Sequence, residues 1–202
     1  MDAVIFDIDG TLLQSAAVDD ELYQQAVRHA LPGAHIRPSL LDYDYVSDSG
    51  ILSQIFVDNE VGSHDDLSGI IQTKFIELLT DHIDRSGAFV EVPGALRFLQ
   101  HHVESDEHAV AYATGGWRAS AVLKLRAAGF GHFDIPLATA DDALDRKDIM
   151  LSALSQLGES FRSITYYGDG PWDKESSEQL GWDFVAVGRK LGGLESYEEL
   201  LR

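Results

Sequence analysis

Two acidic residues, Asp7 and Asp9, follow the first apolar run of the chain, in the sequence VIFDIDGT. The run AVIFD (residues 3–7) is typical of a buried strand, and carboxylates at its end are costly to desolvate unless something compensates their charge. A bound cation provides that compensation. With Asp7 as a ligand, the backbone carbonyl of Asp9 can bind the same cation while its side chain remains free to transfer protons.

Two further apolar runs end in the same way as the first. Thr114 ends AVAYAT (residues 109–114), Asp169 ends SITYYGD (residues 163–169), and glycine follows each of them. Ligands of open parallel sheets bind outside the carboxyl ends of the strands. We therefore expect Asp7, Thr114 and Asp169 to converge at one edge of a sheet.

The expected metal is Mg²⁺, because the candidate donors are all oxygen atoms. Mg²⁺ accepts one or two protein carboxylates and keeps its remaining positions for water and substrate phosphate. Asp7, Asp169 and the backbone carbonyl of Asp9 are the predicted ligands.

Four motifs, in order along the whole chain, resemble those of the haloacid dehalogenase superfamily of hydrolases. DIDGTL (residues 7–12) resembles the first motif, and Thr114 in YATGG resembles the second. Lys147 in DRKDIM resembles the third, and GDGPWD (residues 168–173) resembles the fourth. An insertion after the first motif is similar to the helical cap of phosphoglycolate-phosphatase-like members.

The resemblance implies a role for each of these residues. Asp7 is the expected nucleophile, forming an aspartyl-phosphate, and Asp9 the expected general acid and base. Thr114, Gly115 and Lys147 are expected to bind the phosphoryl oxygens. The second acid favours phosphate over carbon–halogen substrates, because a halide needs no proton to leave.

Asp173 is expected to support both the metal and Lys147. The alternative is a purely structural role, because a carboxylate in the first turn of a helix is favourable in any case. Trp117 and Arg118, just beyond the second motif, are candidates for substrate contact, with packing and solvent exposure as their alternatives.

The third motif departs from the family pattern, because Asp148 rather than proline follows Lys147. Lys124 is the other lysine between the second and fourth motifs, and its place within a helix predicts that it lies too far from the strand ends. Arg146 is a rival, but a compact ammonium suits a crowded site better. Lys147 is therefore the predicted cation.

The elements that position these residues alternate between strand and helix. Near-continuous apolar runs predict strands that are covered on both faces, and helical patterns lie between them. This order predicts an α/β fold with a Rossmann-like, doubly wound parallel sheet. The expected strands are 3–7, 109–114, 133–139, 163–169 and 183–188, and the expected helices between them include 95–103, 120–130 and 148–158.

Residues 14–87 interrupt this alternation. The stretch contains helical patterns and no convincing strand, and it is too long for a loop. We expect a helical cap subdomain at 14–87, inserted into a core formed by 1–13 and 88–202. The segment DYDYVSDSG (residues 42–50) is either a loop that enters the site or a plain connection between helices.

The composition narrows the classes of partner and compartment. The formal net charge of −19 argues against nucleic acid and anionic membrane as partners. The absence of cysteine excludes a disulfide framework and a thiolate site. The start of the chain does not resemble a signal peptide, and no apolar run is long enough to span a bilayer. We expect a cytoplasmic protein, either a monomer or a homodimer.

The predicted function is a Mg²⁺-dependent phosphatase acting on a small phosphorylated metabolite. The acidic cap favours a monophosphate whose remainder is neutral or cationic. A phosphomutase that uses the same core is one alternative, and a phospho-accepting receiver-like signalling domain is another.

Overall fold

A computed structural model describes residues 1–62, 65–158 and 160–201, and a parallel sheet lies at its centre. In this described part the sheet has five strands in the order β3-β2-β1-β4-β5, every neighbouring pair being parallel. The Rossmann-like α/β fold expected from the sequence is thereby confirmed. The strands are β1 (Asp2–Phe6), β2 (His108–Ala113), β3 (Leu137–Ala138), β4 (Ile164–Gly168) and β5 (Asp183–Ala186).

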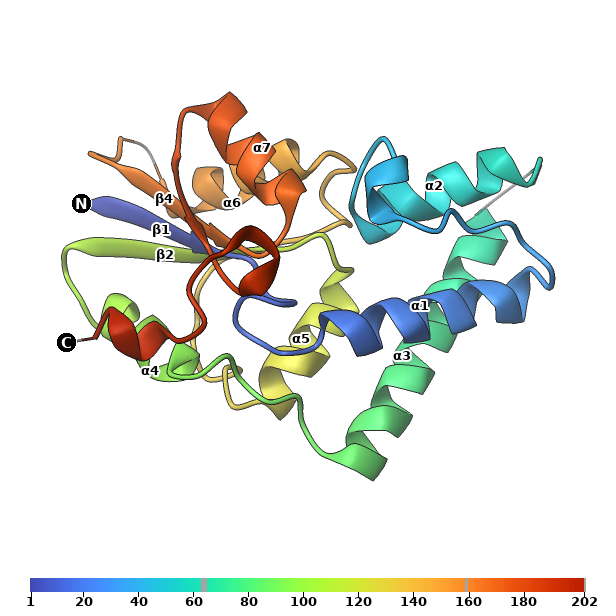
Figure 1. The fold of residues 1–202 in the computed structure, drawn as a ribbon, viewed down its shortest axis with the longest axis horizontal. Helices are drawn as coiled ribbons and strands as arrows, with labels where there is room; N and C mark the ends of the chain where they lie inside the picture. Colours follow the sequence, from blue (N-terminus) through green and yellow to red (C-terminus); the bar gives the residue numbers. More distant parts are fainter. Residues whose placement is uncertain (63–64, 159, 202) are drawn as a thin grey trace.

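Helices cover both faces of the sheet, as Figure 1 shows. Alternate residues of β1 point to opposite faces: Phe6 packs with Phe98 of α4 (Ala95–Val103), in a core cluster that α5 (Arg118–Ala127) also joins, and Ile5 packs with α6 (Arg146–Leu157). The helix α7 (Pro171–Leu180) lies beside α6. Burial on both faces explains why the strands read as continuous apolar runs in the sequence.

The weakest predicted strand is much shorter than expected. The sequence suggested residues 133–139, whereas β3 comprises only Leu137 and Ala138. β3 is an edge strand, and Pro136 beside it has no N–H with which to extend the ladder. Its carbonyl still accepts a hydrogen bond from the amide of Tyr112 at 2.8 Å.

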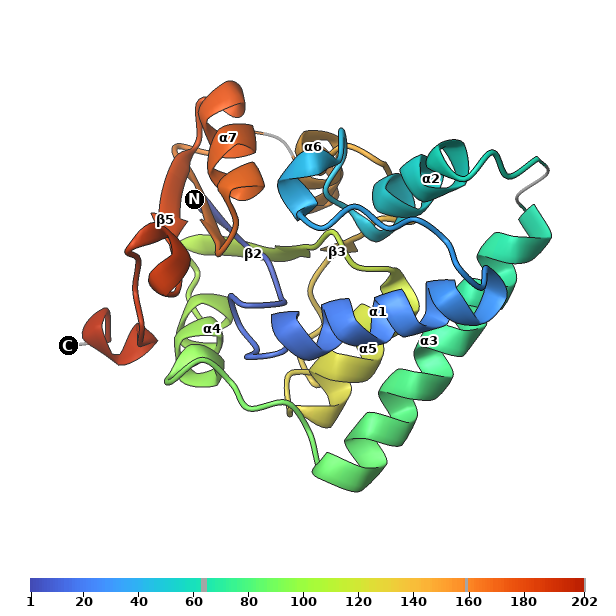
Figure 2. The same ribbon diagram turned by 45° about the vertical axis from the view of Figure 1, so that its right-hand side comes forward.

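Three helices and a short 3₁₀ turn occupy the region between β1 and α4 and lie to one side of the sheet (Figures 1 and 2). α1 packs along α3, and α3 also contacts α5 of the core. The elements are α1 (Ala16–Ala30), η1 (Leu40–Asp42), α2 (Asp48–Asp58) and α3 (Asp65–Ser86).

Two segments of backbone join these helices to the core, and they run side by side. The amide of Gln14 donates to the carbonyl of Val90 at 2.8 Å, and the amide of Val92 donates to the carbonyl of Leu12 at 2.8 Å. The backbone therefore enters and leaves the helical group through one narrow, hydrogen-bonded double connection.

The last described elements, η2 (Arg189–Leu191) and η3 (Tyr197–Glu199), follow β5. Across the described residues, none of the helices combines the length and the apolar character that crossing a membrane requires.

Candidate active site

Three buried carboxylates meet at the carboxyl edge of the sheet. Asp7 follows β1 directly, and its amide still donates to the carbonyl of Tyr167 on β4 at 2.9 Å. Asp169 follows β4, and Asp173 lies in the first turn of α7. One carboxylate oxygen of each lies within 4.8 Å of the others, and all three side chains are buried. The parallel strands thus bring Asp7 and Asp169 together, as the sequence suggested.

This cluster fits a hard divalent cation. Burial raises the pKa of Asp7 well above its usual range, and the negative charge of Asp173 raises it further. A cation held by these oxygens would relieve both effects. Gly10 leaves room for the cluster, because a Cβ atom at this position would collide with the carboxylate of Asp169. The backbone carbonyl of Asp9 stays a predicted ligand.

A buried cation, Arg146, lies beside the cluster. Its Nη1 lies 3.4 Å from Oδ1 of Asp7, and its Nε lies 3.3 Å from Oδ1 of Asp173. Burial acts to lower the pKa of Arg146, but the surrounding carboxylates, above all Asp173, outweigh it and raise this pKa. Arg146 is therefore a permanently charged group next to Asp7.

Lys147, the cation expected from the sequence, is not brought to this place. Its Nζ lies 3.5 Å from Oε1 of Gln179 on α7, in an exposed contact. The reason is local. Asp145 caps α6 by accepting from the amide of Lys147 at 2.9 Å, so Arg146 is the first helical residue. The next residue is turned by about 100° around the helix axis, which moves Lys147 away from the strand ends.

Thr114 and the two glycines after it complete this edge of the sheet. Thr114 is buried, and its Oγ1 accepts from the amide of Gly116 at 3.2 Å. A Cβ atom on Gly115 would lie 2.7 Å from Nη2 of Arg146 and 3.0 Å from the carbonyl oxygen of Val46. Only glycine lets the arginine and the helical insertion approach this loop so closely.

Asp9 faces a lysine that the sequence reasoning excluded. Nζ of Lys124 donates to the two carboxylate oxygens of Asp9 at 2.7 Å and 2.6 Å, and it also pairs with Asp19 of α1. The expectation that Lys124 lies too far along its helix is wrong. Helical side chains lean toward the N-terminus of their helix, and here the long lysine extends back toward the strand ends. Its place on the buried face of α5, with Ala121 and Leu125, was the available signal.

A second residue that sequence reasoning missed is Lys190 in η2. Its Nζ lies 2.7 Å from Oδ2 of Asp169, while its side chain remains 60% exposed. It follows the edge strand β5 in a segment without a motif, so only its place at the carboxyl end of a strand hinted at this contact.

Asp173 is fully buried, and it contacts Arg146 rather than the expected Lys147. Its Oδ2 accepts from the amide of Gly170 at 3.0 Å, which caps α7. Its Oδ1 faces Arg146 and accepts no hydrogen bond. The structural role as a helix cap is therefore present, support of Lys147 is not, and support of the metal stays a prediction.

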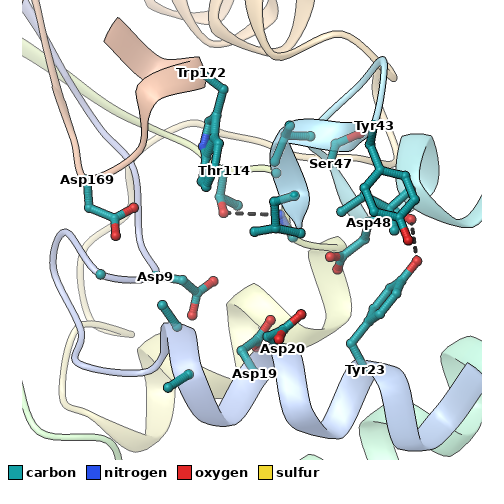
Figure 3. Close-up of a pocket in the computed structure, with 18 of the residues that line it drawn as sticks. Asp9, Asp19, Asp20, Tyr23, Tyr43, Ser47, Asp48, Thr114, Asp169 and Trp172 are labelled. Carbon is teal, nitrogen blue, oxygen red and sulfur yellow. Dashed lines mark hydrogen bonds between the residues drawn. The ribbon is translucent and has the colours of Figure 1, made fainter. Parts of the chain in front are cut away.

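A cavity of about 550 Å³ opens above these groups, between the strand ends and the helical insertion. In Figure 3, Asp9, Asp169 and Thr114 lie toward one side of the view, and Tyr43 and Asp48 lie toward the other. Asp19, Asp20 and Tyr23 project from α1 along the floor of the same view. The carboxylates that line the cavity are Asp7, Asp9, Asp19, Asp20, Asp48 and Asp169.

The segment 42–50 enters the site. The amide of Asp48 donates to the carbonyl of Gly115 at 2.7 Å, and its Oδ2 accepts from the amide of Trp117 at 2.9 Å. The hydroxyl of Tyr23 donates to the carbonyl of Asp48 at 2.9 Å, the contact drawn in Figure 3. Of the two interpretations of this segment, the loop at the site is correct.

Trp117 and Arg118 are directed away from the cavity. Trp117 is buried against Tyr23 and Phe75, with ring centroids 5.4 Å and 5.9 Å apart. Arg118 pairs with Asp142 at 2.8 Å. Packing and surface pairing account for these two residues.

The geometry agrees with the comparison against known proteins. The family model of haloacid dehalogenase-like hydrolases matches residues 1–181. No curated protein matches the chain. The chain therefore belongs to the haloacid dehalogenase-like hydrolase family, and it is a hydrolase.

Solved structures share the fold at low sequence identity. A β-phosphoglucomutase from Clostridium difficile is 17% identical, with a TM-score of 0.70, and the match covers 98% of this chain and 86% of that one. A hydrolase from Pseudomonas syringae is 19% identical, with a TM-score of 0.69, over 91% and 83% of the two chains. The protein CbbY from Rhodobacter sphaeroides, in complex with phosphate, is 18% identical, with a TM-score of 0.65, over 96% and 87%.

Proposed function

We propose that this hydrolase is a Mg²⁺-dependent phosphatase that cleaves a small phosphomonoester through an aspartyl-phosphate on Asp7. The observation that carries this proposal is the grouping of Asp7 with Asp169 and Arg146 at the mouth of the cavity, with Asp9 facing the same space. Clustered carboxylates next to a buried guanidinium suit phosphoryl transfer, in which negative charge spreads over the phosphoryl oxygens.

The proposed reaction has two balanced steps. In the first, an oxygen of Asp7 forms a bond to phosphorus while the bond to the leaving oxygen breaks, and the carboxyl group of Asp9 gives that oxygen a proton. In the second, water gives a proton to the carboxylate of Asp9 and attacks phosphorus, which releases phosphate and restores Asp7. Arg146, the hydroxyl of Thr114 and the amide of Gly115 are proposed to hold the phosphoryl oxygens.

Mg²⁺ is proposed to bind between Asp7, Asp169 and the backbone carbonyl of Asp9, where it would neutralise charge on the phosphoryl group. Asp173 supports this arrangement from behind by holding Arg146. Lys147 is not part of this proposal, because its Nζ contacts Gln179.

The charges at the far end of the cavity favour a leaving group that is neutral or cationic. Asp20 of α1 and Asp48 of α2 line the cavity on the side of the helical insertion. Among the cavity-lining residues that the structure describes, each cationic side chain already has a carboxylate partner. These pairs are Arg37 with Asp58, Arg146 with Asp7, and Lys190 with Asp169. A second anionic group on the substrate would therefore meet carboxylates.

The same charges favour a phosphatase over a phosphomutase. A mutase returns the phosphoryl group to another hydroxyl of the sugar, so a bisphosphorylated species has to occupy its site. A variant of the CbbY protein was solved with xylulose bisphosphate. Here the far end of the cavity is acidic, which disfavours such a ligand.

Residues 14–87 are proposed to act as a cap that opens for exchange and closes during phosphoryl transfer. The narrow double connection at Gln14 and Val90 supports a movement of this unit relative to the core. The hydrogen bond from the amide of Asp48 to the carbonyl of Gly115 joins the helical insertion to the loop after β2, which supports a closed position of the proposed cap.

The test is release of inorganic phosphate from a panel of aminoalkyl, sugar, carboxylated and bisphosphorylated substrates, with and without Mg²⁺. We expect Mg²⁺-dependent hydrolysis, preference for neutral or cationic leaving groups, and loss of at least about a thousandfold in kcat for Asp7→Asn without unfolding. Near-normal activity of Asp7→Asn would contradict the nucleophile assignment. A preference for phosphoglycolate would contradict the proposed leaving group, and an isomerised sugar phosphate as product would favour the mutase.

A further inference from the structure

Lys124 is a charged residue in the interior of the protein. Its side chain is 0% exposed, and its Nζ contacts only Asp9 and Asp19 among the described residues. Burial acts to lower the pKa of Lys124, but the negative charges of Asp19 and Asp9 outweigh it and raise this pKa. The ammonium group is therefore held between two carboxylates that lie 115 and 105 positions away from it in the sequence.

Two side chains, those of Lys124 and Ser15, donate hydrogen bonds to the carboxylate of Asp9. Nζ of Lys124 bonds both carboxylate oxygens of Asp9, and the hydroxyl of Ser15 donates to Oδ1. Asp19 then ties Lys124 to α1 of the helical insertion. Asp9 thus takes its orientation from α5 and α1, and not from its own strand alone.

Stability alone is a weak explanation for this arrangement. Burying an ion pair costs much of what its Coulomb attraction returns, and well-packed apolar side chains are often as stabilising. Ala121 and Leu125 show that the same helix face accepts apolar residues. A lysine at this point, in contact with the second acid of the site, points to a role in the reaction.

We propose that Lys124 and Asp19 are positioning residues for Asp9: Lys124 fixes the Asp9 carboxyl group toward the cavity, and Asp19 fixes Lys124. This inference rests on the proposed function, in which Asp9 gives a proton to the leaving oxygen and later accepts one from water. Asp19 also provides a second counter-ion, so the ammonium group remains paired while Asp9 carries the transferred proton.

A series of leaving groups separates positioning from a general structural effect. Protonation of the leaving oxygen matters little for a 4-nitrophenolate leaving group and greatly for an alkoxide leaving group. For Lys124→Met, we expect about 100-fold slower Mg²⁺-dependent hydrolysis of an alkyl phosphate, with phenyl phosphate intermediate. The first-turnover burst of 4-nitrophenolate should change by less than about fivefold, because that step needs little proton transfer. Lys174→Met, at an exposed lysine of α7, is the matched control and should behave as the wild type.

Two further variants make the result independent of folding. Lys124→Met leaves Asp9 and the buried Asp19 without a cationic partner, so the double variant Lys124→Met/Asp19→Asn is made alongside it and should show the same selective loss. Lys124→Arg should recover part of the alkyl phosphate activity. Equal losses for all leaving groups, or a faster alkyl phosphate reaction, would overturn the positioning role while leaving the phosphatase intact. A wild-type protein without Asp7-dependent hydrolysis would overturn the proposed function and this inference with it.

Discussion

Arg146 Nη1 lies 3.4 Å from Oδ1 of Asp7, so an arginine is the cation next to the proposed nucleophile. The next residue, Lys147, projects from α6 in another direction and contacts Gln179 on α7. A difference of one position along the helix therefore decides which side chain lies beside Asp7.

Replacing each of these two residues with glutamine in turn tests their roles. Arg146→Gln should lower kcat/KM by about 100-fold or more, because a charged donor to the phosphoryl oxygens is lost. Lys147→Gln, the matched control, should stay within about threefold of the wild type. Steady-state kinetics measures the activity of both variants, and circular dichroism checks that both are folded. A severe loss in Lys147→Gln with a mild one in Arg146→Gln would restore the lysine to the site.

Metal binding is expected to depend on Asp169. Chelation with EDTA should abolish hydrolysis, and added Mg²⁺ should restore it. Asp169→Asn removes a charged ligand and should weaken Mg²⁺ binding by at least about tenfold, measured by isothermal titration calorimetry. Asp148→Asn, at an exposed position of α6, should bind Mg²⁺ as the wild type does. Equal binding by both variants would contradict the proposed ligand set.

The carboxyl group of Asp48 should make the stability of the folded protein fall as the pH rises. Burial, followed by the negative charge of Asp19, raises the pKa of Asp48 well above its usual range. An unfolded aspartate ionises near pH 4, while the folded one keeps its proton to higher pH. Its contribution to stability is therefore lost as the pH rises above about 4, until Asp48 itself ionises in the folded state.

Asp48→Asn cannot ionise and should be more stable than the wild type at pH 8, with the difference vanishing near pH 4. Each kcal/mol gained corresponds to a rise of about 2–4 °C in the unfolding midpoint. Thermal unfolding without metal, at several pH values, measures this. Asp44→Asn, at an exposed position, is the control. A variant that is less stable than the wild type at pH 8 would show that the Asp48 charge is stabilising.

Ser47 connects the helical insertion to the core. Its Oγ accepts from the amide of Gly50 at 3.2 Å, capping α2, and donates to the carbonyl of Leu144 at 2.7 Å. Ser47→Ala should reduce the free energy of unfolding by about 1 kcal/mol, measured by urea denaturation. Ser39→Ala, which removes the cap of the short turn η1, is the control and should cost less. Unchanged stability in Ser47→Ala would remove this link between cap and core.

Much of the fold follows from local patterns in the sequence. Apolar runs that end in a polar residue and glycine predict parallel strands, and their carboxyl ends necessarily meet. That rule alone brings Asp7, Thr114 and Asp169 together. The helix α4 has the bounds that the sequence suggested, and α5 and α6 begin two residues earlier than expected.

The cations of the site were not predictable in the same way. The choice between Arg146 and Lys147 depends on where Asp145 begins the helix, which rotates each side chain by a fixed angle. The contact between Lys124 and Asp19 joins residues 105 positions apart. It depends on the packing of the helical insertion against the core, which has no local signature.

The central place of β1 in the sheet has a consequence for biosynthesis. β1 pairs with β2 and β4, whose residues emerge from the ribosome roughly a hundred or more positions later. Asp7 is thus translated well before its neighbours Arg146 and Asp173, and 139 positions separate it from Arg146. A nascent chain that extends only through the helical insertion therefore carries Asp7 without the side chains that surround it in the folded protein, so this site assembles only after residues far along the chain have been made.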